Sequence, residues 1–255
     1  MFYSKDKYSI TKYIYLRSCH STNDYGTNVS SISNPNQNYC VYTYNQTDGK
    51  GQIGRKWHMG EGLDIACSFY FCIDDLLAKH HFYLNMAVGI SVHDTVSEYV
   101  DDGQVRIKWP NDIYVNDKKI AGILIQNQIK GKYISKTIIG VGININTESF
   151  PEELPNPTSI MNSSTKDKNL SQLKVLHSLE KNLRQRLSQM QVAHAQARKE
   201  YMEKLYRAYE LHYYENKQGE LIEAKIIGIS EEGKLQLSTK ESIKEFAFRE
   251  ITYRI

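Results

Sequence analysis

The chain has 255 residues, 40% of them hydrophobic, which is enough for one large domain with a sizeable core and a small appendage. Its net charge of +3 is too mild to indicate a nucleic-acid-binding protein, and no apolar run approaches the length of a membrane span. The amino-terminal segment lacks the apolar stretch of a signal peptide, and the four cysteines show no C-x-x-C spacing, so we expect free thiols, a cytoplasmic location and no membrane partner.

Stretches rich in β-branched and aromatic residues predict a sheet in the first half of the chain. The segments where we expect strands are 8–17, 39–45 and 64–73. A helix facing the core is expected over 81–100, because its apolar residues recur at helical spacing.

Ser21, Thr22 and Asn23 form a short polar cluster after the first expected strand. Short side chains of this kind favour a helix N-cap, because their oxygens accept hydrogen bonds from free backbone N–H groups. The same groups could instead hydrogen-bond a neutral heterocycle. These residues alone leave both interpretations open.

Residues 46–58, QTDGKGQIGRKWH, contain three glycines and three cations but almost no apolar side chain. Glycine lets backbone N–H groups approach a ligand closely, and the cations favour an anion with several oxygens, such as a phosphate chain. The loop matches the dinucleotide fingerprint G-x-G-x-x-G, but a turn and a strand follow where that fingerprint requires a helix. A solvated basic hairpin loop is the alternative interpretation.

A proline interrupts the strand expected over 105–116. Because Pro110 has no N–H to donate to a strand ladder, the chain must bend or bulge there. We expect the bend to bring Lys108, Asn111 and Asp112 near one another.

Two later strands carry small residues in their interiors. The first runs from 119 to about 129 and contains Gly122. The second spans 137–146, where Gly140 and Gly142 are two apart and therefore share a face. The space left by these small residues lets a flat ligand lie on the sheet, although a bulge or tight packing would also explain the paired glycines.

The C-terminal part of the chain changes character. A long amphipathic helix is expected after Ser171, and a second helical segment over about 193–215. From Gly219 onward, short alternating strands separated by glycines predict a small β-barrel. We therefore expect one domain over 1–217 and a second over 218–255.

The motifs described above occur in a fixed order. They are S-T-N at 21–23, G-K-G-Q-I-G-R-K-W at 49–57, K-W-P-N-D at 108–112 with K-I-A-G at 119–122, and G-V-G-I-N at 140–144. Together they resemble the biotin–protein ligases from about residue 8 to the C-terminus. The space before Ser21 is too short for the helix-turn-helix domain that some members carry, so we expect the short form. The resemblance implies an α+β fold, with a mixed or antiparallel central sheet and flanking helices as in class II synthetases, followed by a small β-barrel.

The resemblance also implies an ATP-dependent ligase with two chemical steps. The carboxylate of biotin attacks the α-phosphate of ATP and gives biotinyl-5′-AMP. A lysine on the biotin carrier domain of acetyl-CoA carboxylase or a related carboxylase then attacks this anhydride and expels AMP. Biotin is thus a substrate, Mg²⁺ arrives with ATP without a fixed protein site, and the enzyme is expected to be a monomer or weak homodimer without nucleic-acid partners.

The same resemblance assigns roles to residues of the matching motifs. The biotin pocket would comprise Ser21, Thr22, Asn23, Gln46, Gly49, Lys50, Gly51, Gln52, Lys119, Gly122, Gly140 and Gly142. The nucleotide would contact Arg55, Trp57, Asn111 and Asn144. Three catalytic lysines, Lys50, Lys108 and Lys119, would offset the repulsion between the two anionic reactants. Asp112 would hold or deprotonate the incoming carrier lysine.

One departure from the family pattern and two alternative functions need to be considered. Many members have arginine where this chain has Gln52, so we expect a weaker grip on the adenylate. A lipoate or octanoate ligase or transferase shares the fold, but the complete glycine loop with K-W-P-N-D favours biotin. A non-catalytic biotin-sensing module is the other alternative, and the retained Lys119 and Asp112 argue against it.

Overall fold

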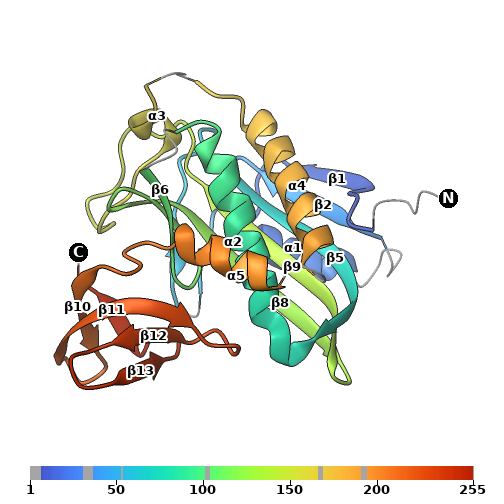
Figure 1. The fold of residues 1–255 in the computed structure, drawn as a ribbon. Coiled ribbons are helices and arrows are strands. Elements are labelled where there is room, and N and C mark those ends of the chain that lie inside the picture. The colour runs from blue at the N-terminus through green and yellow to red at the C-terminus, as the bar shows by residue number, and fades with distance from the viewer. Residues whose placement is uncertain are drawn as a thin grey trace.

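A computed structural model describes residues 7–30, 37–52, 54–100, 104–165, 169–190 and 194–254. These residues form a large sheet with helices on it and a smaller sheet at the C-terminal end (Figure 1). None of the described helices is long and apolar enough to cross a membrane.

The large sheet has seven strands. Their order is β1 (Lys12–Leu16), β2 (Tyr39–Thr43), β5 (Ile65–Leu77), β9 (Tyr133–Ile143), β8 (Lys118–Lys130), β7 (Asp112–Val115) and β6 (Val105–Lys108). Strands β1 and β2 run parallel, whereas the remaining neighbours are antiparallel. The sheet is therefore mixed, as expected.

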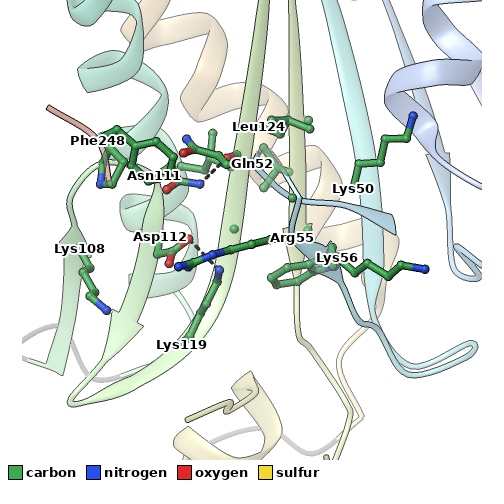
Figure 2. A pocket seen from close by; sticks show the side chains of 18 of the residues that line it. Lys50, Gln52, Arg55, Lys56, Lys108, Asn111, Asp112, Lys119, Leu124 and Phe248 are labelled. Carbon is green, nitrogen blue, oxygen red and sulfur yellow. Dashed lines mark hydrogen bonds and ion pairs between the residues drawn. The ribbon is translucent and has the colours of Figure 1, made fainter. Parts of the chain in front are cut away.

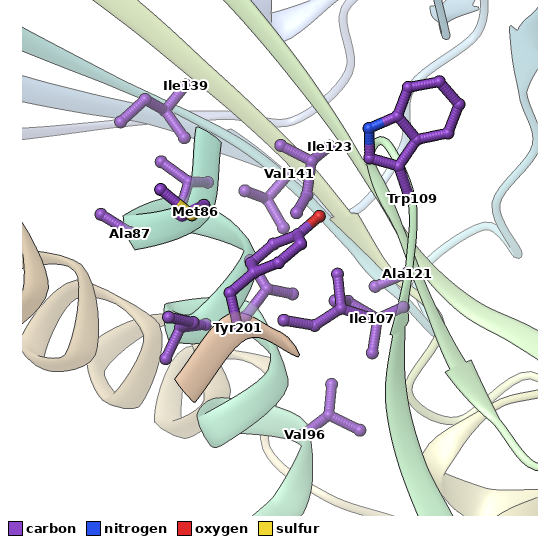
Figure 3. Packing of buried hydrophobic residues seen from close by; sticks show 14 of the residues in the cluster. Met86, Ala87, Val96, Ile107, Trp109, Ala121, Ile123, Ile139, Val141 and Tyr201 are labelled. Carbon is purple, nitrogen blue, oxygen red and sulfur yellow. The ribbon is translucent and has the colours of Figure 1, made fainter. Parts of the chain in front are cut away.

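Three helices cover one face of this sheet (Figure 1). They are α2 (His81–Ser97), α4 (Gln172–Gln189) and α5 (His194–Glu203), with short helices η1 (Ala78–His80) and α3 (Ile160–Ser163) nearby in the chain. Figure 3 shows Ile139 and Val141 of β9 beside Met86 of α2 and Tyr201 of α5, all buried in one apolar cluster. Because side chains alternate along a strand, Gly140 and Gly142 face the opposite side.

The expected strand over 105–116 is two strands. Residues 109–111 turn the chain, so that β6 and β7 form an antiparallel hairpin with Lys108 opposite Asp112. The proline thus reverses the chain, where the sequence predicted only a bend or bulge. The expected proximity of Lys108 and Asp112 is confirmed.

The face of the sheet opposite the three helices carries α1 (Thr22–Ser30) and the glycine-rich loop. The Tyr70 hydroxyl donates to the backbone carbonyl of Asn23 at 2.7 Å, and the Tyr39 hydroxyl donates to that of Gly26 at 2.8 Å. A side chain at Gly26 would overlap the ring of Tyr70, so glycine is required for this close packing of α1 on the sheet.

The second sheet is antiparallel throughout. Its order is β13 (Ile243–Phe246), β12 (Leu235–Ser238), β11 (Leu221–Ile229), β10 (Leu211–Asn216) and β14 (Ile251–Tyr253). The prediction of a helix over 193–215 was wrong beyond Glu203, because residues 211–216 form strand β10, which pairs with β11 and β14. A domain division after residue 217 would separate β10 from its partner β11, so we propose a division before Leu211.

The connection between the sheets runs along the outer edge of β6. The Ile107 N–H donates to the carbonyl of Lys204 at 2.8 Å, and its carbonyl accepts from the Tyr206 N–H at 2.8 Å. Trp109 in the hairpin turn also donates its indole N–H to the carbonyl of Gly233 at 3.0 Å. These bonds cover an edge strand and fix the second sheet beside the K-W-P-N-D turn.

Candidate active site

A cavity of about 490 Å³ opens on the sheet face that carries α1 (Figure 2). Its walls come from the start of α1, the glycine-rich loop, the β6–β7 hairpin and the β13–β14 segment of the second sheet. This volume is typical of a site for a small molecule.

The polar cluster at the start of α1 is both a helix start and a wall of the cavity. Ser21, Thr22 and Asn23 line the cavity although each is less than 5% exposed. The Thr22 N–H donates to the side-chain carbonyl of Gln46 at 2.9 Å, and Ser21 Oγ accepts a long bond from the Asp24 N–H at 3.4 Å. The cluster therefore begins a helix and also lines the cavity, and its contact with a heterocyclic ligand stays a prediction.

Ser68 of β5 holds this cluster and was missed by the sequence analysis. Its hydroxyl lies 2.8 Å from Thr22 Oγ1 and 2.5 Å from Asn23 Oδ1, and it is fully buried. A hydroxyl within the otherwise apolar run DIACSFYFCI was the signal that could have identified it, because buried polar groups need partners.

The glycine-rich loop forms a small hairpin of β3 (Gly49–Lys50) and β4 (Lys56–Trp57). A side chain at Gly49 would overlap the Trp57 carbonyl and the Gln46 amide, so this tight pairing requires glycine. Lys50 forms an ion pair with Asp24 of α1 at 2.6 Å. The hairpin is thereby tied to α1. Lys50 is among the lining residues, and its ammonium points away from the Lys119–Asp112 pair (Figure 2).

The flat group that lies on the sheet glycines is the indole of Trp57. A side chain at Gly142 would overlap this ring, and a Cβ at Gly122 would lie 3.0 Å from it. The side chain of Asn23 approaches Gly140 in the same way. These glycines thus admit the protein's own side chains, which is the tight packing that the sequence left open as an alternative, and all three also line the cavity.

Lys119 and Asp112 form the central charged pair of the cavity, at 2.8 Å (Figure 2). A register shift in the β7–β8 ladder pairs Ile113 with Ala121 but Tyr114 with Lys119, which leaves Ile120 as an extra residue. This bulge turns Lys119 toward the side that Gly122 also faces. The Lys119 ammonium also lies 5.5 Å from the centroid of the Trp57 ring.

Lys108 is a partly buried cation at the junction of the two sheets. Its ammonium donates to the Tyr114 hydroxyl at 2.8 Å and lies 4.5 Å from the Tyr114 ring centroid and 5.0 Å from that of Tyr253. Burial lowers the pKa of Lys108 to about 8, with Asp112 acting in the opposite direction. This amine therefore titrates close to neutral pH.

The cavity brings together the residues that the motifs singled out, apart from Gly49 and Asn144. Asn111 lines it and donates its amide to the carbonyl of Ile123 at 2.8 Å. Asn144 is 4% exposed and donates instead to the carbonyl of Thr158 at 2.8 Å, away from the lining. Asn111 therefore lies at the cavity whereas Asn144 does not line it, and the nucleotide contacts expected for both stay predictions.

The described lining is strongly cationic. Its positive side chains are Lys50, Arg55, Lys56, Lys108, Lys119 and Arg249, and its acidic side chain is Asp112. Such a cavity favours a ligand with several negative charges. The described residues contain no cluster of three or more His, Cys, Asp or Glu side chains suited to hold a metal ion.

Residues 15–144 match the family model described as the biotin/lipoate A/B protein ligase family. The chain belongs to this family. The matched range contains the motifs at 21–23, 49–57, 108–112, 119–122 and 140–144. The lining residues of the second sheet lie outside the matched range, and no motif had indicated them; they are Phe248, Arg249, Ile251, Thr252 and Tyr253.

The sequence matches to two relatives cover only part of this chain and of each relative. The bifunctional ligase/repressor BirA of Bacillus spizizenii is 34% identical over 138 residues, which are 53% of this chain and 42% of that protein. The biotin–[acetyl-CoA-carboxylase] ligase of Mycobacterium tuberculosis is 29% identical over 119 residues, 46% of this chain and 42% of that protein. The chain thus spans less than half the length of these relatives.

A solved structure of a family member matches over nearly the whole chain. The biotin protein ligase from Aquifex aeolicus, in complex with biotin and ATP, superimposes with a TM-score of 0.74 at 26% identity. The match covers 96% of this chain and 99% of that one. The arrangement of the large sheet, its helices and the second sheet is therefore that of a biotin protein ligase.

Proposed function

We propose that this protein is an ATP-dependent ligase that activates biotin as biotinyl-5′-AMP and transfers it to a lysine of a biotin carrier domain. One observation carries the proposal. A single cavity joins a buried polar wall, a cationic glycine-rich hairpin and the Lys119–Asp112 pair. The names of the Mycobacterium tuberculosis relative and the Aquifex aeolicus structure point to the same activity.

The polar wall suits the ring system of biotin. Thr22, Asn23 and Gln46 present amide and hydroxyl groups that match a neutral ureido group with two donors and one acceptor. Ser68 and Gln46 fix Thr22 before a ligand arrives, which lowers the entropy lost on binding. The side chain of biotin would then run past Gly140 toward Lys119.

In the first step a carboxylate oxygen of biotin bonds to the α-phosphorus of ATP while the bond to the pyrophosphate oxygen breaks. Two like charges 4 Å apart oppose this approach by about 4 kcal/mol at the effective dielectric of a protein surface. Lys119 at the cavity centre and Lys50 at its rim supply positive charge where these groups meet. Mg²⁺ arriving with the nucleotide would neutralise further phosphate charge, and the side-chain oxygen of Asn111 would be suited to contact it.

In the second step the amine of the carrier lysine attacks the anhydride carbonyl and AMP leaves. The amine must lose a proton as the amide forms. Asp112 lines the cavity beside Lys119 and is the carboxylate positioned to orient that amine and accept its proton.

We propose that the carrier is acetyl-CoA carboxylase or a related carboxylase, and that the ligase acts in the cytoplasm as a monomer or weak homodimer without nucleic-acid or membrane partners. The Mycobacterium tuberculosis relative supports this carrier class by its name. Light scattering across a range of concentrations tests the oligomeric state, and a gel-shift titration with DNA tests the absence of a nucleic-acid partner.

The function is tested by incubating the protein with ATP, labelled biotin and a carrier domain, followed by mapping of the modified lysine. Biotin-dependent release of pyrophosphate and label on one lysine are expected. Modification with labelled lipoate or octanoate instead would identify the other ligase activity of the family. Stabilisation by biotin without pyrophosphate release would indicate a binding module.

A further inference from the structure

The turn between β13 and β14 places an arginine in a backbone conformation that favours glycine. Residues 247–250 form a four-residue turn, in which the Glu250 N–H donates to the Ala247 carbonyl at 3.0 Å. Arg249 at the third position has φ +68°, where turns of this kind prefer glycine or asparagine. The Glu250 carboxylate accepts from the Ala247 N–H at 2.8 Å and helps to hold this conformation.

Arg249 is one of the residues that line the cavity. Arg249 and its neighbour Phe248 both line it, and the guanidinium lies 5.5 Å from the Phe248 ring centroid. Figure 2 shows Phe248 on the side of the cavity near Asn111, away from Lys50. An arginine in a backbone conformation that favours glycine, at a position that lines a cavity, indicates a role for the side chain.

The charge of Arg249 is available to a ligand. In the described part of the chain Arg249 has no ion-pair partner, whereas Lys50 and Lys119 lie within 2.8 Å of carboxylates. Lys56 is likewise paired, with Asp48 at 2.9 Å. An incoming anion therefore does not have to displace a carboxylate from Arg249.

The arginine is also held in a fixed place relative to the large sheet. Strand β14, which follows the turn, pairs with β10, and its Tyr253 ring lies 5.0 Å from the Lys108 ammonium. The bond from Trp109 to Gly233 fixes the other end of the second sheet. A cation on such a support is organised before the ligand arrives.

We propose that Arg249 binds the β- and γ-phosphates of the nucleotide and stabilises the departing pyrophosphate. The proposal rests on the proposed function, in which the polar wall takes the biotin ring and Lys119 takes the carboxylate and α-phosphate. The negative charge of the reactants that still lacks an assigned partner is that of the β- and γ-phosphates. The planar fork of an arginine matches phosphate oxygens with two parallel hydrogen bonds.

The test uses the full chain and three variants. Arg249→Asn removes the charge but tolerates the left-handed backbone, and Arg249→Lys keeps a charge without the planar fork. Lys244→Asn is the matched control, because it removes an exposed cation of the same sheet that does not line the cavity. The measurements are KM values for ATP and biotin, inhibition by pyrophosphate, and the melting temperature with and without pyrophosphate.

For Arg249→Asn we expect about a tenfold or larger rise in the KM for ATP and in the inhibition constant of pyrophosphate, as for the loss of a charged hydrogen bond. The KM for biotin should not rise, and the melting temperature without ligand should not fall. Both constants of Arg249→Lys should lie between those of Arg249→Asn and the wild type, and those of Lys244→Asn should equal the wild-type values.

Unchanged ATP and pyrophosphate constants in Arg249→Asn would overturn the proposal, as would a rise confined to the KM for biotin. Failure of the proposed function looks different, since the wild type would then release no pyrophosphate with biotin. In that case stabilisation of the wild type but not of Arg249→Asn by pyrophosphate alone would still support the phosphate site.

Discussion

Lys119 and Gly122 line the same cavity although they are three positions apart in one strand. In a regular strand they would lie on opposite faces, and the extra residue Ile120 reverses this. The bulge depends on how β8 pairs with β7, so no property of the strand's own sequence specifies it. The sequence indicated Gly122 by its small size inside an expected strand, whereas it indicated Lys119 only through the family resemblance.

Lys119→Ala should lower the rate of adenylate formation by about two to three orders of magnitude, the usual cost of one lost charge-stabilising donor. The physical reason is its place beside Asp112 at the cavity centre, where the two anionic reactants would meet. Biotin-dependent pyrophosphate release measures the effect. Lys118→Ala, which removes the neighbouring exposed lysine, is the control. Near-normal pyrophosphate release by Lys119→Ala would remove this lysine from the mechanism.

The buried amine of Lys108 predicts a pH dependence. Its pKa is lowered from 10.5 to about 8, because burial disfavours the charged form. The folded protein therefore releases this proton near pH 8, whereas the unfolded chain keeps it to about pH 10.5. Protonation of the folded state below pH 8 costs stability, and the folded state gains relative stability from this site as the pH rises from 8 to 10.5.

If a charge at position 108 assists the reaction, kcat/KM for ATP should fall as the pH rises through about 8. Lys108→Arg keeps its charge at all these pH values and should move the fall upward by more than one pH unit. The measurement is kcat/KM for ATP between pH 6.5 and 10. An identical alkaline limb in both proteins would show that another group titrates.

The side chain at position 52 should affect how firmly the protein retains biotinyl-5′-AMP. It lines the cavity, and its side-chain oxygen is buried without a hydrogen-bond partner in the described residues. Gln52→Arg should slow the release of biotinyl-5′-AMP, because a cation would attract the phosphate of the adenylate. Free adenylate in a reaction without carrier measures this, with Gln52→Met as the uncharged control. Equal release by wild type and Gln52→Arg would refute the idea.

Among the secondary-structure elements, α1 and β5 act as a unit. The hydroxyl of Ser68 in β5 contacts both Thr22 and Asn23 at the start of α1, so the polar wall depends on a residue outside it. The rigid strand thus sets the orientation of the helix residues that we propose to bind biotin.

Ser68→Ala should raise the dissociation constant for biotin by about tenfold, since two buried polar groups lose a partner worth about 1 kcal/mol or more. The affinity for ATP should change much less. Isothermal titration of each ligand measures the difference. Ser91→Ala is the control, because it removes an equally buried hydroxyl that donates to the Ala87 carbonyl in α2. Parallel losses for both ligands would indicate general destabilisation instead.

The elements also show which features the sequence could reveal. Runs such as YCVYT and the leucine stripe of α4 predicted β2 and α4, because local composition and periodicity reflect local burial. The hairpin at Pro110 and strand β10 were misjudged, because their partners lie elsewhere in the chain. Arg249 and Tyr253 also line the cavity, although they lie more than a hundred residues after the last motif. The sequence could not indicate them, because only the pairing of distant strands brings them to the site.

In the whole molecule, the helix layer is held together by a network of charges. Arg186 of α4 contacts Asp94 of α2 at 2.6 Å and Glu200 of α5 at 2.7 Å, and Lys204 contacts Asp94 at 3.1 Å. Lys204 also begins the segment that covers β6 and leads to the second sheet. The network therefore links the core helices to the part of the chain that carries Arg249.

This network predicts acid sensitivity. Burial acts to raise the pKa of Asp94, but hydrogen bonds from His93 and Arg186, together with the charge of Lys204, hold it well below its ordinary value. Because the folded pKa is depressed, the stabilisation is complete above the unfolded pKa of about 4 and is lost as the pH falls toward the folded pKa. The free energy of unfolding should therefore fall between pH 5 and 2.5, and Asp94→Asn should reduce this dependence.

Urea unfolding at several pH values measures this effect, with Glu203→Gln as the control. Glu203 lies 4.0 Å from Lys199 in an exposed pair, which contributes little to stability, so its loss should leave the pH dependence unchanged. At pH 7 Asp94→Asn should be clearly less stable than the wild type, because Arg186 and Lys204 lose a partly buried counter-charge. The two proteins should converge as the pH approaches 2.5, and parallel curves would place the acid-sensitive group elsewhere.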